Sequence, residues 1–341
     1  MELEGGVNMN LKIFKLMNLD EKEKIKVDEF ILDKSSNGEF INTIEYLSYH
    51  PDGRFIDDSI IVKDLSSGVI KSVIMAGCYS SDKNLIVSHP GTTFSGPIFK
   101  DTQGIIEIEE VLKIILEYYE NRYSKIEFKI QPTIYSSQPI EDISYLLIKY
   151  GFEYGYTSLA NVIDLSNLNN EEDIFKMYDS KRRNQIKKSI RDFNYKIQKY
   201  DLIDENIWNN MNDNLDRKFN AATTHTFSEI TNLKSKFPKK IVPYIAQRQD
   251  GLYGAFALVY TFKNVFHTQY LDLNYNLRQE YPNLLLIHNL IKIAMDEEFR
   301  FFSFGASTEN GGYILNEGLY NYKRGFGGGR IIQPVLRREL R

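Results

Sequence analysis

The order in which helix and strand patterns follow one another constrains this chain more than any other feature. In the first half, a helix pattern over 21–33 precedes a hairpin over 59–76 that turns at Ser66-Ser67-Gly68. A helix pattern over 105–122 and an alternating strand over 125–130 follow. Helices that alternate with strands predict an α/β domain with a mixed sheet.

The second half repeats this order in outline. Its expected elements are a basic helix (173–192), a strand (194–200), a helix (204–219), a hairpin (241–247 and 254–260), a strand (264–272), a helix (282–298), a strand (300–304) and a last strand near 330–337. We therefore predict two related α/β domains, although no sequence repeat is visible. A polar, turn-rich stretch at 166–173 places the expected boundary between residues 1–165 and 166–341.

Several classes of protein are excluded early. The apolar runs are far shorter than the ~20 residues that span a bilayer, and the first residues lack the apolar core of a secretory signal. Cys78 is the single cysteine, so no internal disulfide forms, and one Cys with five His residues argues against a metal cluster. We expect a cytoplasmic protein without a metal, whose natural start is Met9, directly before the first strand.

Charge is distributed unevenly along the chain. Residues 1–160 hold 16 Lys and Arg against 25 Asp and Glu, whereas residues 161–341 hold 26 against 21. The basic balance of the second half favours an anionic ligand there. It is too weak for a dedicated nucleic-acid binder, so we expect no DNA binding.

Four polar and glycine-rich segments crowd the last third of the chain. They are Phe266–Tyr270 (FHTQY), Phe304–Gly312 (FGASTENGG), Leu315–Leu319 (LNEGL) and Tyr322–Arg330 (YKRGFGGGR). These segments resemble the Fem-like branch of the GNAT acyltransferases, found beside polysaccharide biosynthesis enzymes, which carries H-x-Q-Y, F-x-F-G-x-S-T-E, L-N-x-G-L and K-x-x-F-G. Residues 219–230 and 181–186 resemble two further segments of that family. The resemblance covers about 175–337; related proteins carry a degenerate GNAT-like domain in the first half.

The resemblance implies two tandem GNAT-like domains, each a mixed sheet flanked by helices. It also implies an N-acyltransferase that places an acyl or aminoacyl group on the amine of a cell-envelope precursor, such as an amino sugar, a nucleotide sugar or a peptide. The implied catalytic residues are Glu309, His267 and Lys323. The implied substrate-binding residues are His225, Gln269, Tyr270, Ser307, Thr308, Asn316, Arg183, Lys187, Phe326 and Arg330. No tightly bound cofactor is implied, and the glycine run before Arg330 is one residue longer than the family pattern.

Residue chemistry supports these roles but leaves alternatives open. Strict alternation along 264–272 puts His267, Gln269 and Leu271 on one face, either in a substrate site or on an exposed sheet face. Glu309 follows the carboxyl end of a strand, where ligands collect in open α/β sheets, and could take a proton from an attacking amine. The same Ser-Thr-Glu segment could instead cap a helix. Lys323, in a glycine-rich stretch, could stabilise an oxyanion.

Three basic residues outside that region are candidates for ligand contacts. Arg183 and Lys187 lie one helical turn apart and could hold a diphosphate, or belong to a solvated helix face. His225 lies between threonines in a loop and is either a ligand contact or a solvated side chain.

The acyl donor is left undecided between acyl-CoA and aminoacyl-tRNA. GNAT enzymes hold the CoA pyrophosphate on a glycine-rich loop at a helix start, but the equivalent stretch here, 277–283, has no glycine. Two alternatives to the acyltransferase therefore remain. One is a non-catalytic nucleotide- or sugar-binding module on a decayed GNAT fold. The other is a Fem-type ligase that uses aminoacyl-tRNA, with tRNA as a partner.

Overall fold

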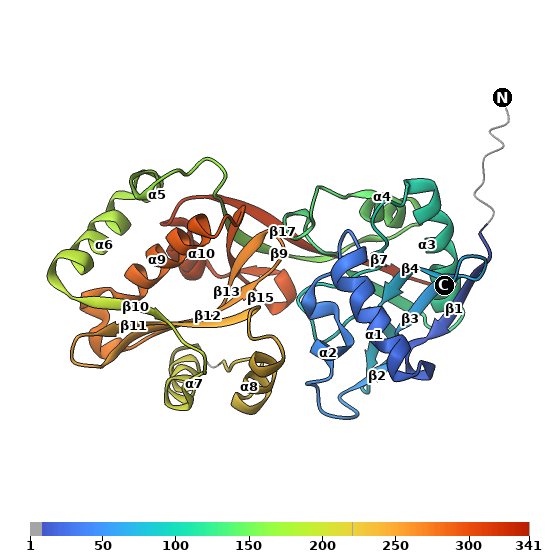
Figure 1. Ribbon diagram of the computed structural model, residues 1–341, viewed down its shortest axis with the longest axis horizontal. Coiled ribbons are helices and arrows are strands. Elements are labelled where there is room, and N and C mark those ends of the chain that lie inside the picture. The colour runs from blue at the N-terminus through green and yellow to red at the C-terminus, as the bar shows by residue number, and fades with distance from the viewer. Residues whose placement is uncertain (1–8, 220, 341) are drawn as a thin grey trace. The chain divides into compact units, whose positions relative to one another are not determined.

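The computed structural model describes residues 9–219 and 221–340. The chain forms two units (Figure 1): one comprises the residues up to Ser158 and those from Ile332 onward, and the other runs from Leu159 to Ile331. We expected the division after residue 165. It falls instead inside two long strands, β9 (Glu153–Asp164) and β17 (Gly329–Glu339). The expectation that Met9 is the natural start concerns residues 1–8, outside the described residues.

Among its described residues, the first unit contains four α-helices and a set of mostly short strands. They are β1 (Leu11–Lys15), α1 (Glu21–Glu29), α2 (Ile44–Leu47), β2 (Phe55–Asp57), β3 (Ile60–Asp64), β4 (Val69–Ile74), β5 (Gly77–Tyr79), β6 (Asp82–Ser88), β7 (Ile98–Phe99), α3 (Ile105–Glu120), β8 (Lys125–Lys129) and α4 (Asp142–Lys149). The predicted hairpin around Ser66-Ser67-Gly68 is β3 and β4, and Gly68 takes the left-handed φ of +69° that the turn requires.

A parallel β–α–β connection organises this unit. β6 pairs in parallel with β8, from Leu85 opposite Lys125 to Ser88 opposite Phe128, and α3 is the crossover between them. The apolar stripe of α3 packs on this sheet: Val111, Leu112 and Ile115 are fully buried beside Ile86 and Ile126. In the same sheet β17, β5 and β2 pair antiparallel, so this sheet is mixed. Strands β1, β3, β4 and β7 form a separate antiparallel sheet.

In the described part of the chain, the second unit contains six α-helices around mixed-sheet strands. Its elements are α5 (Glu171–Met177), α6 (Ser180–Asp192), β10 (Tyr195–Lys199), α7 (Glu205–Phe219), α8 (Phe227–Lys236), β11 (Ile241–Arg248), β12 (Tyr253–Thr261), β13 (Val265–Leu273), α9 (Pro282–Asp296), β14 (Phe301–Ala306), β15 (Thr308–Glu309), β16 (Ile314–Leu315) and α10 (Glu317–Arg324). The strand order is β10-β11-β12-β13-β14-β9, antiparallel except for the parallel pair β13 and β14. Helices α6 and α9 cover one face of the sheet and α7 and α8 the other (Figure 1).

Local sequence explains where the helices of this unit begin. The expected single helix over 173–192 is two helices, because Asp179 starts a new one by accepting the Arg182 N–H at 2.6 Å. Helix α8, which we did not predict, begins at a reciprocal capping box between Thr226 and Glu229. The Thr-x-x-Glu spacing is the sequence signal that could have revealed it.

Helix α9 anchors the core of the second unit. Leu284, Ile287, Leu290 and Ile291 are buried against the small side chains of β12 and the phenylalanines of β13 and β14. At its start the packing is closest beside Gly254 of β12, where a Cβ atom would lie 2.5 Å from the Tyr195 ring and 2.7 Å from Pro282. Glycine is therefore required at position 254 by close approach.

Substitution of this glycine tests the packing. We expect Gly254→Ala to lower the free energy of unfolding by about 1–3 kcal/mol, because the added methyl group overpacks the contact. Gly318→Ala in α10 is the matched control: its Cβ would make only an ordinary 3.6 Å contact, and alanine is the better helix former. Thermal denaturation measures both. Equal midpoints for Gly254→Ala and the wild type would contradict the packing.

Candidate active site

The parallel strands β13 and β14 diverge just after they meet. They share three residue pairs, from Val265 opposite Phe301 to His267 opposite Ser303. Both strands are irregular beyond this point. The register of β13 on β12 shifts so that Gln269 is an extra residue, and the register of β14 on β9 shifts between Ser303 and Ala306. Two bulges on neighbouring strands bend both of them, which accounts for the divergence.

The bulge at Gln269 corrects the predicted alternation. Leu271 lies opposite Ala257 and packs in the α9-side core, whereas His267 lies opposite Tyr260 on the other face. His267 and Leu271 therefore do not share a face, because the extra residue reverses the alternation of the side chains after Thr268. Past the bulge, Tyr270 takes the face of His267, where α7 and α8 pack.

His267 is buried at the point of divergence. Its Nδ1 lies 3.1 Å from the Ser303 hydroxyl, and its ring lies against the backbone of Gly305, which has no Cβ in the way. Gly305 has a φ of +70°, a conformation that favours glycine. Burial first, and the charge of Lys323 second, lower the pKa of His267 to about 4. The imidazole is therefore neutral at neutral pH.

Lys323 of α10 lies close to His267. Its side chain is only 4% exposed, and Nζ donates to the Gly305 carbonyl at 3.1 Å and to the Ala306 carbonyl at 2.5 Å. Burial without a carboxylate partner lowers the pKa of Lys323 to about 7. Near neutral pH the amine therefore exists in both protonation states, as a proton-transfer group requires.

Glu309 occupies a different position from the other two implied catalytic residues. It is exposed on β15, which pairs with β16 in a two-stranded hairpin, and it accepts a hydrogen bond from the Asn316 amide. Asn316 caps α10 by accepting the Leu319 N–H at 2.8 Å. Glu309 is thus joined through Asn316 to the helix that carries Lys323, but no direct contact joins it to Lys323 or His267 in the described part of the chain.

A second group of polar residues extends along the His267 face of β13. The Nδ1 atom of His225, in the segment between α7 and α8, lies 2.7 Å from the Tyr270 hydroxyl, and the Tyr270 ring packs edge-on against Trp208 of α7. His225 is buried, which excludes the alternative of a solvated loop histidine, whereas Gln269 is half-buried. The structure therefore brings His225, Gln269 and Tyr270 to the strand that carries His267.

Two other implied binding residues, Ser307 and Phe326, are buried structural parts of the unit. Ser307 is fully buried and donates to Asn161 at 3.0 Å, which fixes the segment after β14. Phe326 is also fully buried, in the aromatic core beside Phe304, so its side chain holds α10 in place rather than facing a ligand. Thr308 is half-buried on β15, and Arg330 is exposed with its guanidinium over the Tyr320 ring.

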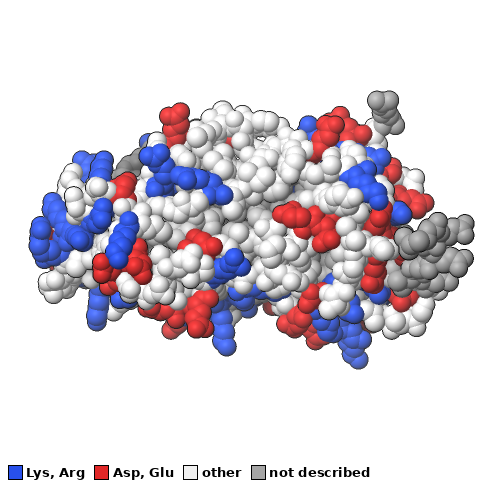
Figure 2. All heavy atoms as spheres, turned by 90° about the horizontal axis from the view of Figure 1, so that it is seen from above, with Lys and Arg blue, Asp and Glu red and all other residues white. Residues whose placement is uncertain are grey.

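The basic helix α6 presents most of its charge outward. Lys and Arg gather at the end of the second unit where α6 lies (Figure 2). Lys187 is exposed with Nζ 5.5 Å from the centre of the Phe175 ring, and Arg183 is half-buried. Arg182, which we had not singled out, turns inward, donates to the Tyr322 carbonyl at 3.0 Å and lies over the Phe326 ring. It ties α6 to α10.

The start of α9 does not fit a pyrophosphate. Tyr281 occupies the cap position with a left-handed φ of +58°, and Pro282 follows in place of a glycine-rich turn. The Glu280 carboxylate lies beside this helix start, bound by Arg248 at 2.8 Å and by the Tyr195 hydroxyl at 2.5 Å. The Glu280 carboxylate already interacts with the positive end of the helix dipole, and its negative charge would repel a phosphate.

Sequence comparison alone does not place this chain. No sequence family matches it, and no curated protein matches it at a significant level. Several solved structures, in contrast, match this chain. FemX superposes with a TM-score of 0.66 at 10% identity over 96% of this chain and 97% of its own. L-PGS from Bacillus licheniformis gives 0.56 at 13% identity, over 94% and 93%. A tandem GNAT protein from the clavulanic acid biosynthesis pathway gives 0.53 at 9%, over 96% and 98%.

These similarities decide the fold. The chain has the tandem GNAT-like fold. The predicted fold class is confirmed. Among the described residues, no helix combines the length and apolar character needed to cross a bilayer. The same residues contain no group of His, Cys, Asp and Glu placed to hold a metal ion.

The buried imidazole should make stability depend on pH. The pKa of His267 is about 4 in the folded protein against 6.5 for an ordinary histidine. The unfolded chain binds the extra proton between these values, so stability falls as the pH drops from 6.5 to 4, by about 3 kcal/mol for this group. We expect His267→Gln to have a shallower slope in urea denaturation across this range. An unchanged slope would contradict the burial of a neutral imidazole.

Proposed function

We propose that this chain is an N-acyltransferase that moves an acyl or aminoacyl group onto the amine of a cell-envelope precursor, such as an amino sugar, a nucleotide sugar or a peptide. One observation carries the proposal. The buried amine of Lys323 lies beside His267 where β13 and β14 diverge, and it is held by the carbonyls of Gly305 and Ala306. A desolvated amine with a lowered pKa is characteristic of sites that transfer protons.

The proposed reaction is a direct transfer of the acyl group from the donor to the amine, without a bound metal ion. The acceptor amine attacks the carbonyl carbon of the ester or thioester donor, a C–N bond forms, and negative charge develops on the carbonyl oxygen. Collapse of this intermediate breaks the C–O or C–S bond, and the proton lost by the amine is transferred to the leaving oxygen or sulfur. The amide product and the free alcohol or thiol balance the reactants.

Lys323 suits the charge-bearing part of this reaction. Its protonated form has three N–H groups, of which two go to Gly305 and Ala306, so one is left for the developing oxyanion. Its neutral form keeps those two hydrogen bonds and has a lone pair for a proton. Glu309, or a water held by His267 and Gln269, is the proposed acceptor of the proton from the amine.

We propose two alternative acyl donors, acyl-CoA and aminoacyl-tRNA. Glu280 beside the α9 start counts against CoA bound in the manner of GNAT enzymes. The lack of a glycine-rich pyrophosphate loop over 277–283 favours the second candidate function, a non-catalytic nucleotide- or sugar-binding module. Incubation with each donor and with amine acceptors of the three classes, followed by mass spectrometry of the acceptor, separates these cases. An increase in the mass of the acceptor would support transfer, whereas no increase with any of the donors would contradict it.

Lys323→Met tests the central residue. It removes the amine but keeps the length of the side chain, so we expect transfer to fall about 100-fold or more, as for loss of a single oxyanion donor. Arg324→Ala, at the exposed neighbouring position of α10, should keep wild-type kcat. Thermal denaturation checks that both variants fold. Full activity in folded Lys323→Met would remove Lys323 from the mechanism.

Glu309→Gln tests the proposed base. Glutamine retains a carbonyl oxygen to accept from Asn316, so we expect the hairpin and the melting temperature to persist. Loss of the base should lower kcat by about 10²–10⁴-fold and alter its pH profile. An unaltered kcat would exclude Glu309 as the base and assign the proton to Lys323 or water.

A further inference from the structure

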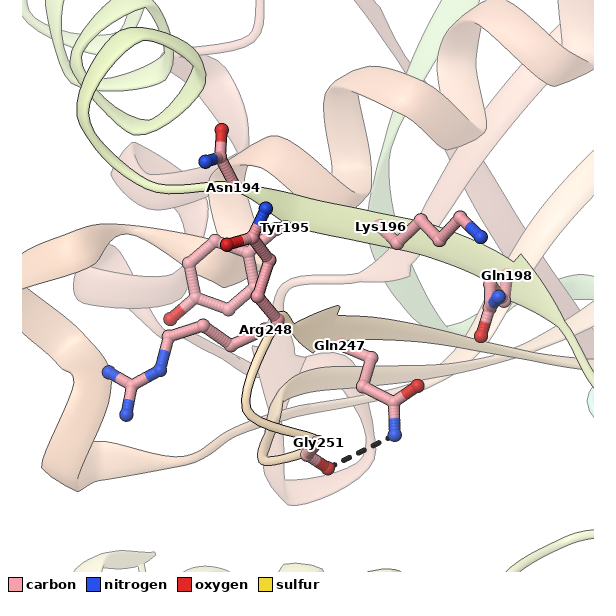
Figure 3. Close-up of a pocket in the computed structure, with 8 residues that line it drawn as sticks. Asn194, Tyr195, Lys196, Gln198, Gln247, Arg248 and Gly251 are labelled. Atoms are coloured by element: carbon pink, nitrogen blue, oxygen red, sulfur yellow. Dashed lines mark hydrogen bonds between the residues drawn. The ribbon is translucent and has the colours of Figure 1, made fainter.

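Two adjoining cavities lie along the free edge of the second unit's sheet. One, of about 580 Å³, is lined by residues of β10 and of the β11–β12 hairpin, some of which Figure 3 shows. The other, of about 760 Å³, continues between the sheet and α7. Both are lined by Gln247 and Gly251, so they form one groove, which we call the edge groove. None of the residues proposed above to catalyse acyl transfer lines it.

The floor of the edge groove follows from strand periodicity. Lys196 and Gln198 of β10, and Tyr200 just beyond it, share one face, and Gln247 of β11 lies opposite Lys196 on that face. The Tyr200 hydroxyl lies 3.1 Å from the Gln198 amide oxygen and 3.4 Å from that of Gln247. Gln247 also donates to the Gly251 carbonyl at 3.0 Å, as Figure 3 shows. These contacts fix two side-chain amides side by side.

The groove keeps unused hydrogen-bonding capacity. In the described part of the chain, the amide nitrogen of Gln198 has no hydrogen-bond partner, and neither do the side chains of Asn194, Asn206 and Gln249. Each amide has two N–H donors and a carbonyl acceptor in one plane. A row of such groups suits a ligand whose polar groups both donate and accept, which is the property of a hydroxyl.

Charge in the groove is largely neutralised. Arg248 is paired with Asp250 at 2.6 Å and with Glu280 at 2.8 Å. Asp204 is engaged as the cap of α7, where it accepts the Ile207 N–H at 3.0 Å. Lys196 is the remaining cation among the described lining residues. This balance favours an uncharged polar ligand over a polyanion such as RNA.

Apolar side chains border the same surface. Leu202 is 76% exposed and Leu252 49% exposed, and Ile245 lies on the floor between the polar residues. Tyr253 adds an aromatic ring, which a ligand with apolar C–H faces can cover. From Lys196 to Tyr200 the strand covers about 13 Å, which is longer than one sugar ring.

We propose that the edge groove is a binding site for a neutral saccharide chain of several units. Side-chain amides and tyrosines would bind the hydroxyl groups, while the leucines and tyrosine rings pack on the C–H faces of the sugars. The proposal does not depend on acyl transfer, because the groove shares no residue with the proposed catalytic group. A polymer held there would be a substrate or an anchoring partner of this chain.

Binding to a panel of neutral oligosaccharides tests the proposal. The probes are hexasaccharides of N-acetylglucosamine, glucose and mannose at millimolar concentration, followed by saturation-transfer NMR and calorimetry without any acyl donor. We expect at least one to bind with an affinity that added salt leaves nearly unchanged. Failure of the whole panel to bind, or capture of an anionic polymer with a steep salt dependence instead, would overturn the proposal.

Variants locate the site. The double substitution Gln198→Ala and Gln247→Ala should weaken binding about tenfold or more, because it removes two amides that hydrogen-bond the ligand. Asn209→Ala is the matched control, since Asn209 is an exposed amide on α7 that does not line the groove. Equal affinities for the double variant and the wild type would place the saccharide elsewhere and refute the assignment. Because donor is absent, this outcome is independent of whether transfer occurs.

Discussion

The amine of Lys323 is the contact on which the proposed chemistry depends. Lys323 lies in the last turn of α10, and its amine donates to the last two carbonyls of β14. Those carbonyls are available because the strand bulges at Gly305. A Cβ at Gly305 would lie 3.2 Å from the His267 ring, so the glycine, the imidazole and the amine constrain one another. Desolvation is the main cause of both lowered pKa values, about 4 for His267 and about 7 for Lys323.

The first unit builds a comparable arrangement from different elements. Lys129, at the end of β8, donates to the carbonyls of Pro90 at 3.2 Å and Thr92 at 2.8 Å, and burial lowers the pKa of Lys129 to about 8. His89, directly after β6, is buried, and its pKa is lowered to about 3. In both units, then, a desolvated lysine holds backbone carbonyls near the carboxyl end of the central parallel pair. The two units therefore resemble each other in these side chains as well as in the order of their elements.

The sequence predicted regular elements well because periodicity records burial. The helix over 105–122 and the hairpin around Asp250-Gly251 are confirmed, and so is the two-fold order of elements. The β-bulges were not predicted, because a bulge does not change the hydrophobic periodicity of the sequence. No residue near Gln269 indicates that the alternation of side chains reverses there. Motif resemblance brought together His267 and Lys323, but it could not show that Phe326 is core and that Arg182, not Arg183, turns inward.

A direct measurement of the Lys323 amine tests the central claim. The Lys323 side-chain signal in a ¹³C-lysine-labelled sample, assigned by its loss in Lys323→Met, is followed by NMR across the pH range. We expect a titration midpoint near 7, the value to which burial lowers the pKa of this group. A midpoint near 10.5, as for an ordinary lysine, would show that the amine is solvated and would contradict the proposed site.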